Sequence, residues 1–233
     1  MGGAQPKTTT SKDMTEMPWT STGSVAVVVA QQFNPSAVTQ LWLMNRGVVR
    51  AEEFVEGGDL FTGMIVQVRT TRFQLLLLQE QLQFVPLVPP EEQQAVLKER
   101  LGTLIDGLSY TPYKALGLNF TWQLAPAHRD VKRLTRELFR VPDSPLHREF
   151  GDDGVWYGGY LSKDFAGFRL KLDIKPVTLP SPTGEHRLQF AFNFHCDLEG
   201  AESGRRIHER LSQWDQVRAE SEHILDTVEP RQT

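Results

Sequence analysis

This chain has a single cysteine, little net charge and no long hydrophobic run. Cys196 is the only cysteine among 233 residues, so no disulfide can form within the chain and a reducing compartment is the simpler interpretation. The formal net charge of −4 gives the whole chain no positive field that would attract nucleic acid or anionic lipid. No apolar run approaches the roughly 18 residues of a membrane-spanning helix, and residues 1–20 lack the apolar core of a signal peptide. We therefore expect a soluble, cytoplasmic protein.

The sequence motifs of the common catalytic and cofactor sites are missing as well. There is no Gly-x-x-x-x-Gly-Lys, Gly-x-Gly-x-x-Gly, Gly-x-Ser-x-Gly or His-Glu-x-x-His motif, and the six histidines do not have the spacing of a metal cluster. His195 precedes Cys196, but adjacent residues of a strand point to opposite faces and do not easily form a nucleophile–base pair. The sequence therefore predicts no catalytic residue, no metal site and no cofactor.

Residues 23–110 have the pattern of a strand, a helix, three strands and a second helix. Alternation of apolar and polar residues predicts half-buried strands, and apolar residues three and four positions apart predict helices. The stretch Phe73–Phe84 is long enough for two short strands with a bend at Gln79-Glu80. The expected elements are a strand at 24–32, a helix from Pro35 to Gly47, a loop at 48–60, a strand at 64–69, two strands within 73–84 and a helix from Pro90 to about Gly107.

Residues 111–228 show the same order of elements. The expected elements are a strand at 115–124, a helix after Pro126, a loop at 140–153, strands at 155–161, 168–179 and 187–195, and a long helix at 204–228. Residues 1–22 are polar and without periodicity, which predicts a disordered tail in which only Trp19 packs back on the body. A second short tail is expected at 229–233.

A repeated stretch supports a duplicated architecture. Phe, Leu and Leu recur at the same phase when Phe73–Phe84 is aligned with Phe168–Leu179, and Gly63 then matches Gly158. Two β-α-β-β-β-α halves with helices segregated to one face of an antiparallel sheet are an α+β fold. This order resembles the TATA-binding-protein fold, in which two such halves form one curved sheet with helices on its convex side. The resemblance covers residues 23–228 and implies a fold without implying a function.

A second resemblance lies in the segment Thr111–Phe120, which reads TPYKALGLNF and follows a leucine-rich helix. It is similar to a segment of an uncharacterised bacterial protein family of similar length. That family has no assigned chemistry, so the resemblance implies no functional residues.

One face of the predicted sheet carries mainly polar side chains. If the apolar positions of the second half (Leu116, Phe120, Leu170, Leu172, Phe190 and Phe192) face the helices, their neighbours face away. A covered face should not be so polar, so this face is expected to be open and able to bind a ligand, a peptide or a nucleic-acid backbone. An ordinary solvated face explains the pattern equally well. The candidate binding residues are Gln67, Arg69, Leu76, Leu78, Asn119, Thr121, Gln123, Arg169, Lys171, Asn193 and His195.

Three functional hypotheses use this face. Leu76 and Leu78 stand where the second half has Lys171 and Asp173, and such an apolar outer patch favours a non-enzymatic binding or assembly protein that binds a protein partner or its own copy. The alternative is a nucleic-acid-binding protein. This hypothesis rests on the resemblance to the TATA-binding-protein fold and on Arg69, Arg169, Lys171 and Lys175, although the polar set has no aromatic residue for base stacking. An enzyme of unknown class is the third hypothesis, supported by a shared face for Asn119, Asp173, Asn193 and His195.

Overall fold

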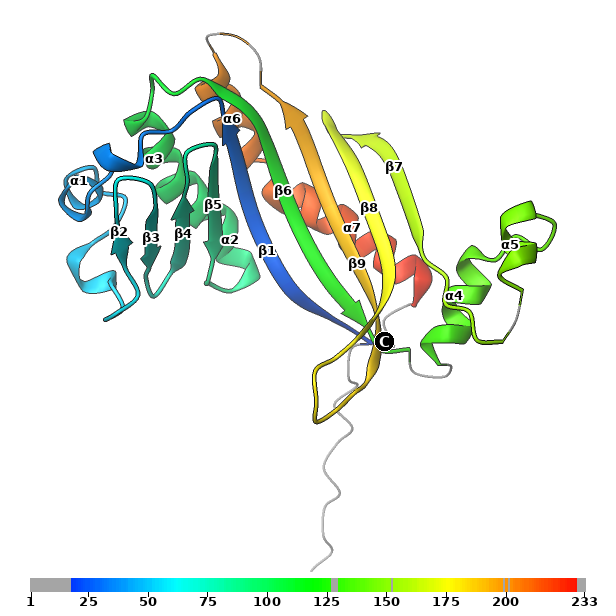
Figure 1. Cartoon of the computed structure of the whole chain (residues 1–233). Coiled ribbons are helices and arrows are strands. Elements are labelled where there is room, and N and C mark those ends of the chain that lie inside the picture. Colours follow the sequence, from blue (N-terminus) through cyan, green and yellow to red (C-terminus); the bar gives the residue numbers. More distant parts are fainter. Residues whose placement is uncertain (1–17, 127–129, 152, 199, 201, 230–233) are drawn as a thin grey trace, which may run out of the picture.

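The computed structural model describes residues 18–126, 130–151, 153–198, 200 and 202–229. Their strands form one open antiparallel sheet of nine strands in the order β2-β3-β4-β5-β1-β6-β9-β8-β7 (Figure 1). The strands are β1 (Trp19–Ala30), β2 (Leu60–Phe61), β3 (Val66–Arg69), β4 (Phe73–Leu77), β5 (Gln81–Pro86), β6 (Tyr113–Leu124), β7 (Gly159–Phe165), β8 (Phe168–Thr178) and β9 (His186–Asp197).

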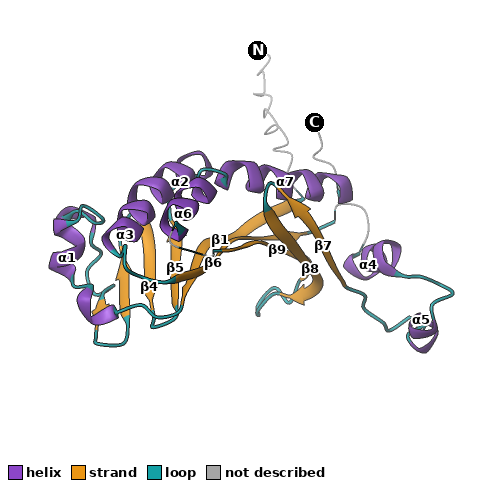
Figure 2. Ribbon diagram, turned by 90° about the horizontal axis from the view of Figure 1, so that it is seen from above, coloured by secondary structure: helices purple, strands orange, loops and turns teal. Residues whose placement is uncertain are grey.

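The helices gather on one side of this sheet. Figure 2 shows α2, α3, α6 and α7 along one side of the curved sheet, and no helix among the described residues covers the opposite face. A π-helical turn, Leu97–Leu101, joins α2 to α3. The helices are α1 (Gln40–Asn45), α2 (Pro90–Val96), α3 (Gly102–Gly107), α4 (Val131–Phe139), α5 (Pro145–Glu149), α6 (Ser203–Leu211) and α7 (Trp214–Val228). The predicted α+β class, with a curved antiparallel sheet and helices on one face, is confirmed.

The strand order runs outward from the central pair β1 and β6. It continues as β5-β4-β3-β2 on one side and as β9-β8-β7 on the other. The stretch Phe73–Phe84 forms β4, a turn and β5, whereas Phe168–Leu179 lies almost entirely in the single strand β8. The two copies therefore correspond structurally only over their first five residues, and an internal duplication of the chain stays a prediction.

The core lies between the sheet and the helices, and aromatic side chains dominate its middle. The Trp214 ring of α7 packs on Phe120 of β6 with ring centroids 4.6 Å apart, and its indole Nε1 donates to Gln93 Oε1 of α2 at 3.3 Å. Phe120 in turn stacks on Trp122 at 5.8 Å. Since a buried indole N–H needs an acceptor, Gln93 satisfies that need and joins α7 to α2.

The turn between β7 and β8 is held by the junction of α6 and α7. Ala166 and Gly167 form this two-residue turn with φ of 51° and 78°. Arg210 Nη1 donates to the Ala166 carbonyl oxygen at 3.0 Å, and Gln213 Nε2 donates to the same oxygen at 3.2 Å. The helix expected at 204–228 is interrupted here, because Ser212 and Gln213 lie between α6 and α7.

Other expectations need correction. The predicted tail does not extend to residue 22, because Trp19–Thr22 belong to β1 and the indole of Trp19 packs edge-on against Trp122 with ring centroids 6.5 Å apart. Residues 1–17 and 230–233 lie outside the described residues.

The expected loop at 140–153 contains α5. The strand expected at 155–161 is β7, displaced toward the polar residues 162–164, because a strand at the edge of a sheet does not need an apolar pattern.

No helix in the described part of the chain is long and apolar enough to cross a membrane.

Candidate functional site

The two faces of the sheet differ as the alternation predicted. The helix-facing side chains are buried, with Leu116 and Phe120 at 0% exposure and Leu172 at 3%. The eleven candidate residues all lie on the other face, where each is exposed or partly exposed. We call this helix-free surface the open face.

Cross-strand pairing joins these side chains into rows across the open face. Each row follows the register from one strand to the next, so its members are neighbours in space. One unbroken row crosses all nine strands: Leu60, Gln67, Leu76, Gln83, Val27, Gly117, His195, Arg169 and Asp164. A second row runs beside it through Val25, Asn119, Asn193 and Lys171.

The remaining candidates lie farther along the same strands. Thr121 lies opposite Ala191, which is itself opposite Asp173, and Gln123 lies opposite Gln189. Leu78 follows the last residue of β4, and its backbone N–H donates to the Gln81 carbonyl oxygen at 2.8 Å. The structure therefore places all candidates on one surface, spread over it rather than gathered into one pocket.

The centre of the open face is apolar, which the sequence interpretation missed. Val25, Val27 and Val29 of β1 are partly exposed on this face, and so is Val85 of β5. The β-branched, apolar composition of residues 24–32 is that of a buried strand. The odd-numbered valines instead line the uncovered side of a central strand. Because the residues on both sides of this strand are apolar, alternation in the sequence does not show which of them face the helices and which face the open side.

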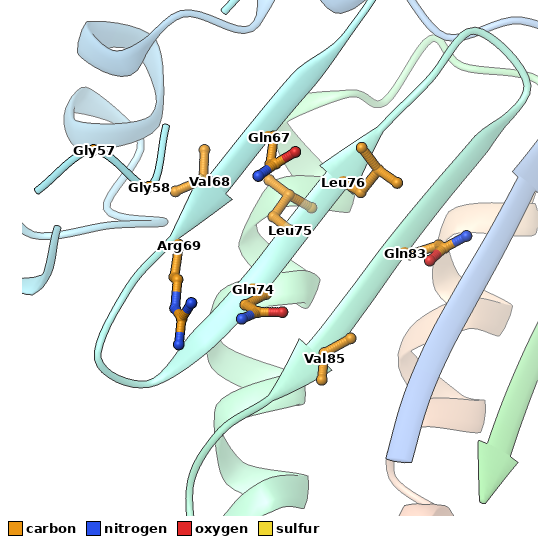
Figure 3. A pocket seen from close by; sticks show the side chains of 10 residues that line it. All are labelled: Gly57, Gly58, Gln67, Val68, Arg69, Gln74, Leu75, Leu76, Gln83 and Val85. Carbon is orange, nitrogen blue, oxygen red and sulfur yellow. The ribbon is translucent and has the colours of Figure 1, made fainter. Parts of the chain in front are cut away.

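A hollow of about 430 Å³ lies on the open face beside β3, β4 and β5. Figure 3 shows the side chains of Arg69, Gln74 and Gln83 around it, together with Leu76 and Val85. Its lining consists of Gly57, Gly58, Gln67, Val68, Arg69, Gln74, Leu75, Leu76, Gln83 and Val85. Three of the predicted binding residues, Gln67, Arg69 and Leu76, therefore share one concave site.

The backbone around Arg69 is fixed from two sides. Its N–H donates to Asp59 Oδ1 at 3.1 Å, and its carbonyl oxygen accepts from the Val55 N–H at 3.1 Å. Gly58 approaches so closely that a Cβ there would lie 2.8 Å from Arg69 Cβ. This contact explains the second glycine of the Gly57-Gly58 pair, while the φ of 71° at Gly57 explains the first. Hydrogen bonds and close packing therefore fix the backbone at this side of the hollow.

An asparagine pair bridges β6 and β9 on the open face. Asn193 Nδ2 donates to Asn119 Oδ1, and Asn119 Nδ2 lies 3.4 Å from the carbonyl oxygens of Val25 and Gly117. The adjacent Gly117 leaves room for these amides, because a Cβ there would lie 3.3 Å from Asn119 Nδ2. These bonds use both N–H groups of Asn119 and one of Asn193, so one N–H and the Oδ1 of Asn193 can still bind a partner.

Two of the four cations on which the nucleic-acid hypothesis rests lie beside carboxylates. Arg169 Nη1 contacts Asp164 Oδ1 and Lys175 Nζ contacts Asp173 Oδ2, each at 3.1 Å. His195 Nε2 also lies 3.1 Å from Asp197 Oδ1. The two ion pairs offset part of the positive charge on which the nucleic-acid hypothesis depends. They are also largely solvent-exposed, so they contribute little stability.

His195 and Cys196 do not form a reactive pair. His195 lies on the open face, whereas Cys196 points into the core and is 6% exposed. Burial is the main cause that raises the pKa of the Cys196 thiol, against the lowering effect of the Arg210 charge. A thiol with a raised pKa is a poor nucleophile at neutral pH. No group of three or more His, Cys, Asp or Glu that could hold a metal ion occurs among the described residues.

Comparison of the chain with protein-family models, with curated proteins and with solved structures gave no match. The two resemblances seen in the sequence therefore stay expectations.

Proposed function

We propose that this chain is a non-enzymatic binding protein that holds a protein partner on its open face. The observation that carries the proposal is the distribution of chemistry there: a half-buried valine strip on β1, a hollow beside it, and amides around both. Stable protein interfaces combine an apolar centre with a polar rim. The open face has that arrangement.

The side chains around the hollow suit a partner with carboxylate or amide side chains. Arg69 presents its guanidinium at the hollow, and Gln67, Gln74 and Gln83 surround the site with amide donors and acceptors. Guanidinium groups bind carboxylates in a bidentate geometry. Leu76 and Val85 at the same hollow would bury the aliphatic stem of such a side chain.

The nucleic-acid alternative has weaker support. Arg169 and Lys175 already contact carboxylates, so few cations of the face are available to neutralise phosphates. Affinity for a nucleic-acid backbone comes largely from such neutralisation and from the release of counterions. The exposed centre of the face also consists of valines, which do not stack on bases.

Site-specific photo-crosslinking in the cells that produce this protein tests the proposal. A photo-reactive amino acid at Gln83 would react with whatever lies in the hollow, and one at Glu209, on the helix side, is the matched control. We expect a defined protein adduct from position 83 that Leu76→Asp and Arg69→Glu both abolish. The absence of any adduct, an equal adduct from position 209, or an adduct that resists both variants would overturn the proposal.

The salt dependence of nucleic-acid binding distinguishes the nucleic-acid alternative from the protein-binding proposal. If the purified chain binds a DNA or RNA duplex with an affinity that falls steeply as salt is raised, and Lys171→Glu removes that binding, the open face is a nucleic-acid surface and the protein proposal is wrong. We expect no such binding at low salt.

A further inference from the structure

The two edges of the sheet are protected to different degrees. β2, at one edge, has two residues, whereas β7, at the other, has seven and pairs with β8 without a bulge. It contains no proline, and its middle residues 160–164 are all exposed. Proteins usually shorten, bend, cover or charge an edge strand, because its free backbone groups pair readily with another strand. Of these protections β7 has only the charges of Lys163 and Asp164.

The geometry of the β7–β8 turn determines which backbone N–H and C=O groups of β7 point away from the sheet. The two-residue turn at Ala166 and Gly167 makes Phe165 and Phe168 the pair that closes the hairpin by exchanging hydrogen bonds. Hydrogen-bonded pairs then alternate along an antiparallel ladder, so Lys163, Leu161 and Gly159 also bond to β8. The N–H and C=O groups of Tyr160, Ser162 and Asp164 point away from the sheet.

Exposed hydrophobic side chains concentrate around this edge. Of the twelve large hydrophobic residues exposed in the described part of the chain, seven lie between residues 138 and 161. They are Leu138, Val141, Leu146, Phe150, Trp156, Tyr160 and Leu161. Two of them lie in helices, Leu138 in α4 and Leu146 in α5, and Figure 1 shows α4 near the start of β7 with α5 farther from the sheet. An apolar concentration of this kind marks a protein-interaction site.

We propose that β7 is the interface for a second copy of this chain, paired antiparallel to its own counterpart about a two-fold axis at Ser162. Ser162 is the middle residue of β7, so this register uses the whole strand. It pairs all the outward N–H and C=O groups of both copies, since Tyr160 meets Asp164 and Ser162 meets Ser162. This interaction goes beyond the proposed function and does not depend on it.

The side chains of β7 suit their own reversed copy. In this register Leu161 lies opposite Lys163, Tyr160 opposite Asp164 and Gly159 opposite Phe165, so no like charges face each other. Lys163 already contacts Glu220 of α7, and its aliphatic stem is free to cover Leu161 of the partner copy. A shift by two residues toward the turn would instead place Lys163 opposite Lys163.

The two-fold axis also sets the exposed apolar side chains of each copy against the β7–β8 turn of the other. It places the start of one β7 beside the end of the other, so the exposed side chains near α4 and α5 would lie next to the partner's turn. A backbone ladder alone is a weak interface, and burial of these side chains supplies the hydrophobic contribution that a stable dimer needs. Because the axis is perpendicular to the sheet, the open faces of both copies would form one continuous surface.

Sedimentation of the full chain from micromolar to submillimolar concentrations tests the proposal, with disulfide trapping as the second readout. We expect a concentration-dependent dimer. Ser162→Cys should form a covalent dimer under mild oxidation, because paired strand residues meet the distance that a disulfide requires. Leu60→Cys, on the opposite edge, is the matched control and should not. Cys196 is buried, so the wild-type chain gives the background.

Ser162→Pro provides the loss-of-function variant. Its missing N–H points away from β8, so within the protomer the variant loses only the bond from the Ser162 hydroxyl to the Leu170 carbonyl oxygen at 2.9 Å and should melt close to the wild type. The dimer should dissociate at least tenfold more readily. A wild-type chain that stays monomeric throughout, a dimer that Ser162→Pro leaves unchanged, or Leu60→Cys cross-linking faster than Ser162→Cys would each overturn the proposal. Photo-crosslinking from Gln83 is a separate readout, so the open-face and edge proposals fail independently.

Discussion

Arg100 and Glu53 form a buried ion pair with Arg100 Nη2 and Glu53 Oε1 2.9 Å apart. Their residues are only 3% and 7% exposed. Arg100 Nη1 also donates to the Gly47 carbonyl oxygen at 2.9 Å, and Glu53 Oε2 accepts from the Arg50 N–H at 2.9 Å. The pair thus joins the π-helical turn between α2 and α3 to the chain segment that follows α1.

Removal of one partner should destabilise the protein strongly. Arg100→Met leaves the Glu53 carboxylate buried without its cation, which costs about 3–5 kcal/mol in comparable pairs. The exposed pair Arg133–Glu137, with 72% and 41% exposed side chains, is the control, and Arg133→Met should cost less than about 1 kcal/mol. Urea denaturation monitored by circular dichroism measures both. Equal losses in the two variants would contradict a structural role for the buried pair.

Most of the strands could be predicted from the sequence, because strict alternation of apolar and polar residues fits only a strand with one buried and one exposed face. From Leu116 to Leu124 in β6 and from Leu188 to Cys196 in β9 every second residue is apolar, and these residues are buried. The limits of β7 could not be predicted in this way. Its exposed residues 162–164 have no apolar period, since an edge strand is held by its hydrogen bonds to β8 and has no covered face of its own.

Adjacent leucines of β4 should respond in opposite ways to the same substitution. Leu75 is 1% exposed and faces the core, so Leu75→Asp buries an unpaired carboxylate and should unfold the protein or lower its stability by several kcal/mol. Leu76 lies partly exposed on the open face, so Leu76→Asp should change the stability by less than about 1 kcal/mol. Thermal denaturation of both variants is the measurement. Comparable losses would mean that the open face is covered.

Two glycines with left-handed backbone allow a matched test of the β7–β8 turn. Gly167 has a φ of 78° and Gly184 a φ of 55°, so alanine at either site should cost about 1 kcal/mol in backbone strain. A Cβ at Gly167 would also lie 2.5 Å from Arg210 Nη1, whereas a Cβ at Gly184 would contact nothing within 4 Å. Gly167→Ala should therefore lower the unfolding free energy more than Gly184→Ala. The reverse order would exclude the Arg210 contact with the turn.

The candidate site could be predicted only in part. Residues such as Gln67 and Asn119 were recognisable because each is a polar residue between apolar neighbours, which fixes its face. Val27 gave no such signal, because its neighbours are apolar too. The hollow depends on the approach of Gly58 to Arg69, a tertiary contact between a loop and a strand. Neither periodicity nor composition contains information about such contacts.

Stability should decline in alkaline solution, and two buried acids are part of the cause. Burial raises the pKa of the Cys196 thiol and of the Tyr113 hydroxyl, so in each case the unfolded chain loses its proton at a lower pH than the folded protein. The unfolded state then binds fewer protons, and the free energy of unfolding falls as pH rises. The decline should begin near the unfolded pKa of about 8.5 for cysteine and steepen near about 10 for tyrosine.

The variants Cys196→Ala and Tyr113→Phe separate these two contributions. Each substitution changes the absolute stability, because Cys196 is packed in the core and the Tyr113 hydroxyl donates to the Ile105 carbonyl oxygen at 3.1 Å. The slope of the unfolding free energy against pH is therefore the quantity to compare. Urea denaturation at a series of alkaline pH values should give a shallower slope for Cys196→Ala above about pH 8.5 and for Tyr113→Phe at higher pH. Slopes that match the wild type in both variants would show that these protons are lost equally easily from the folded and unfolded chains.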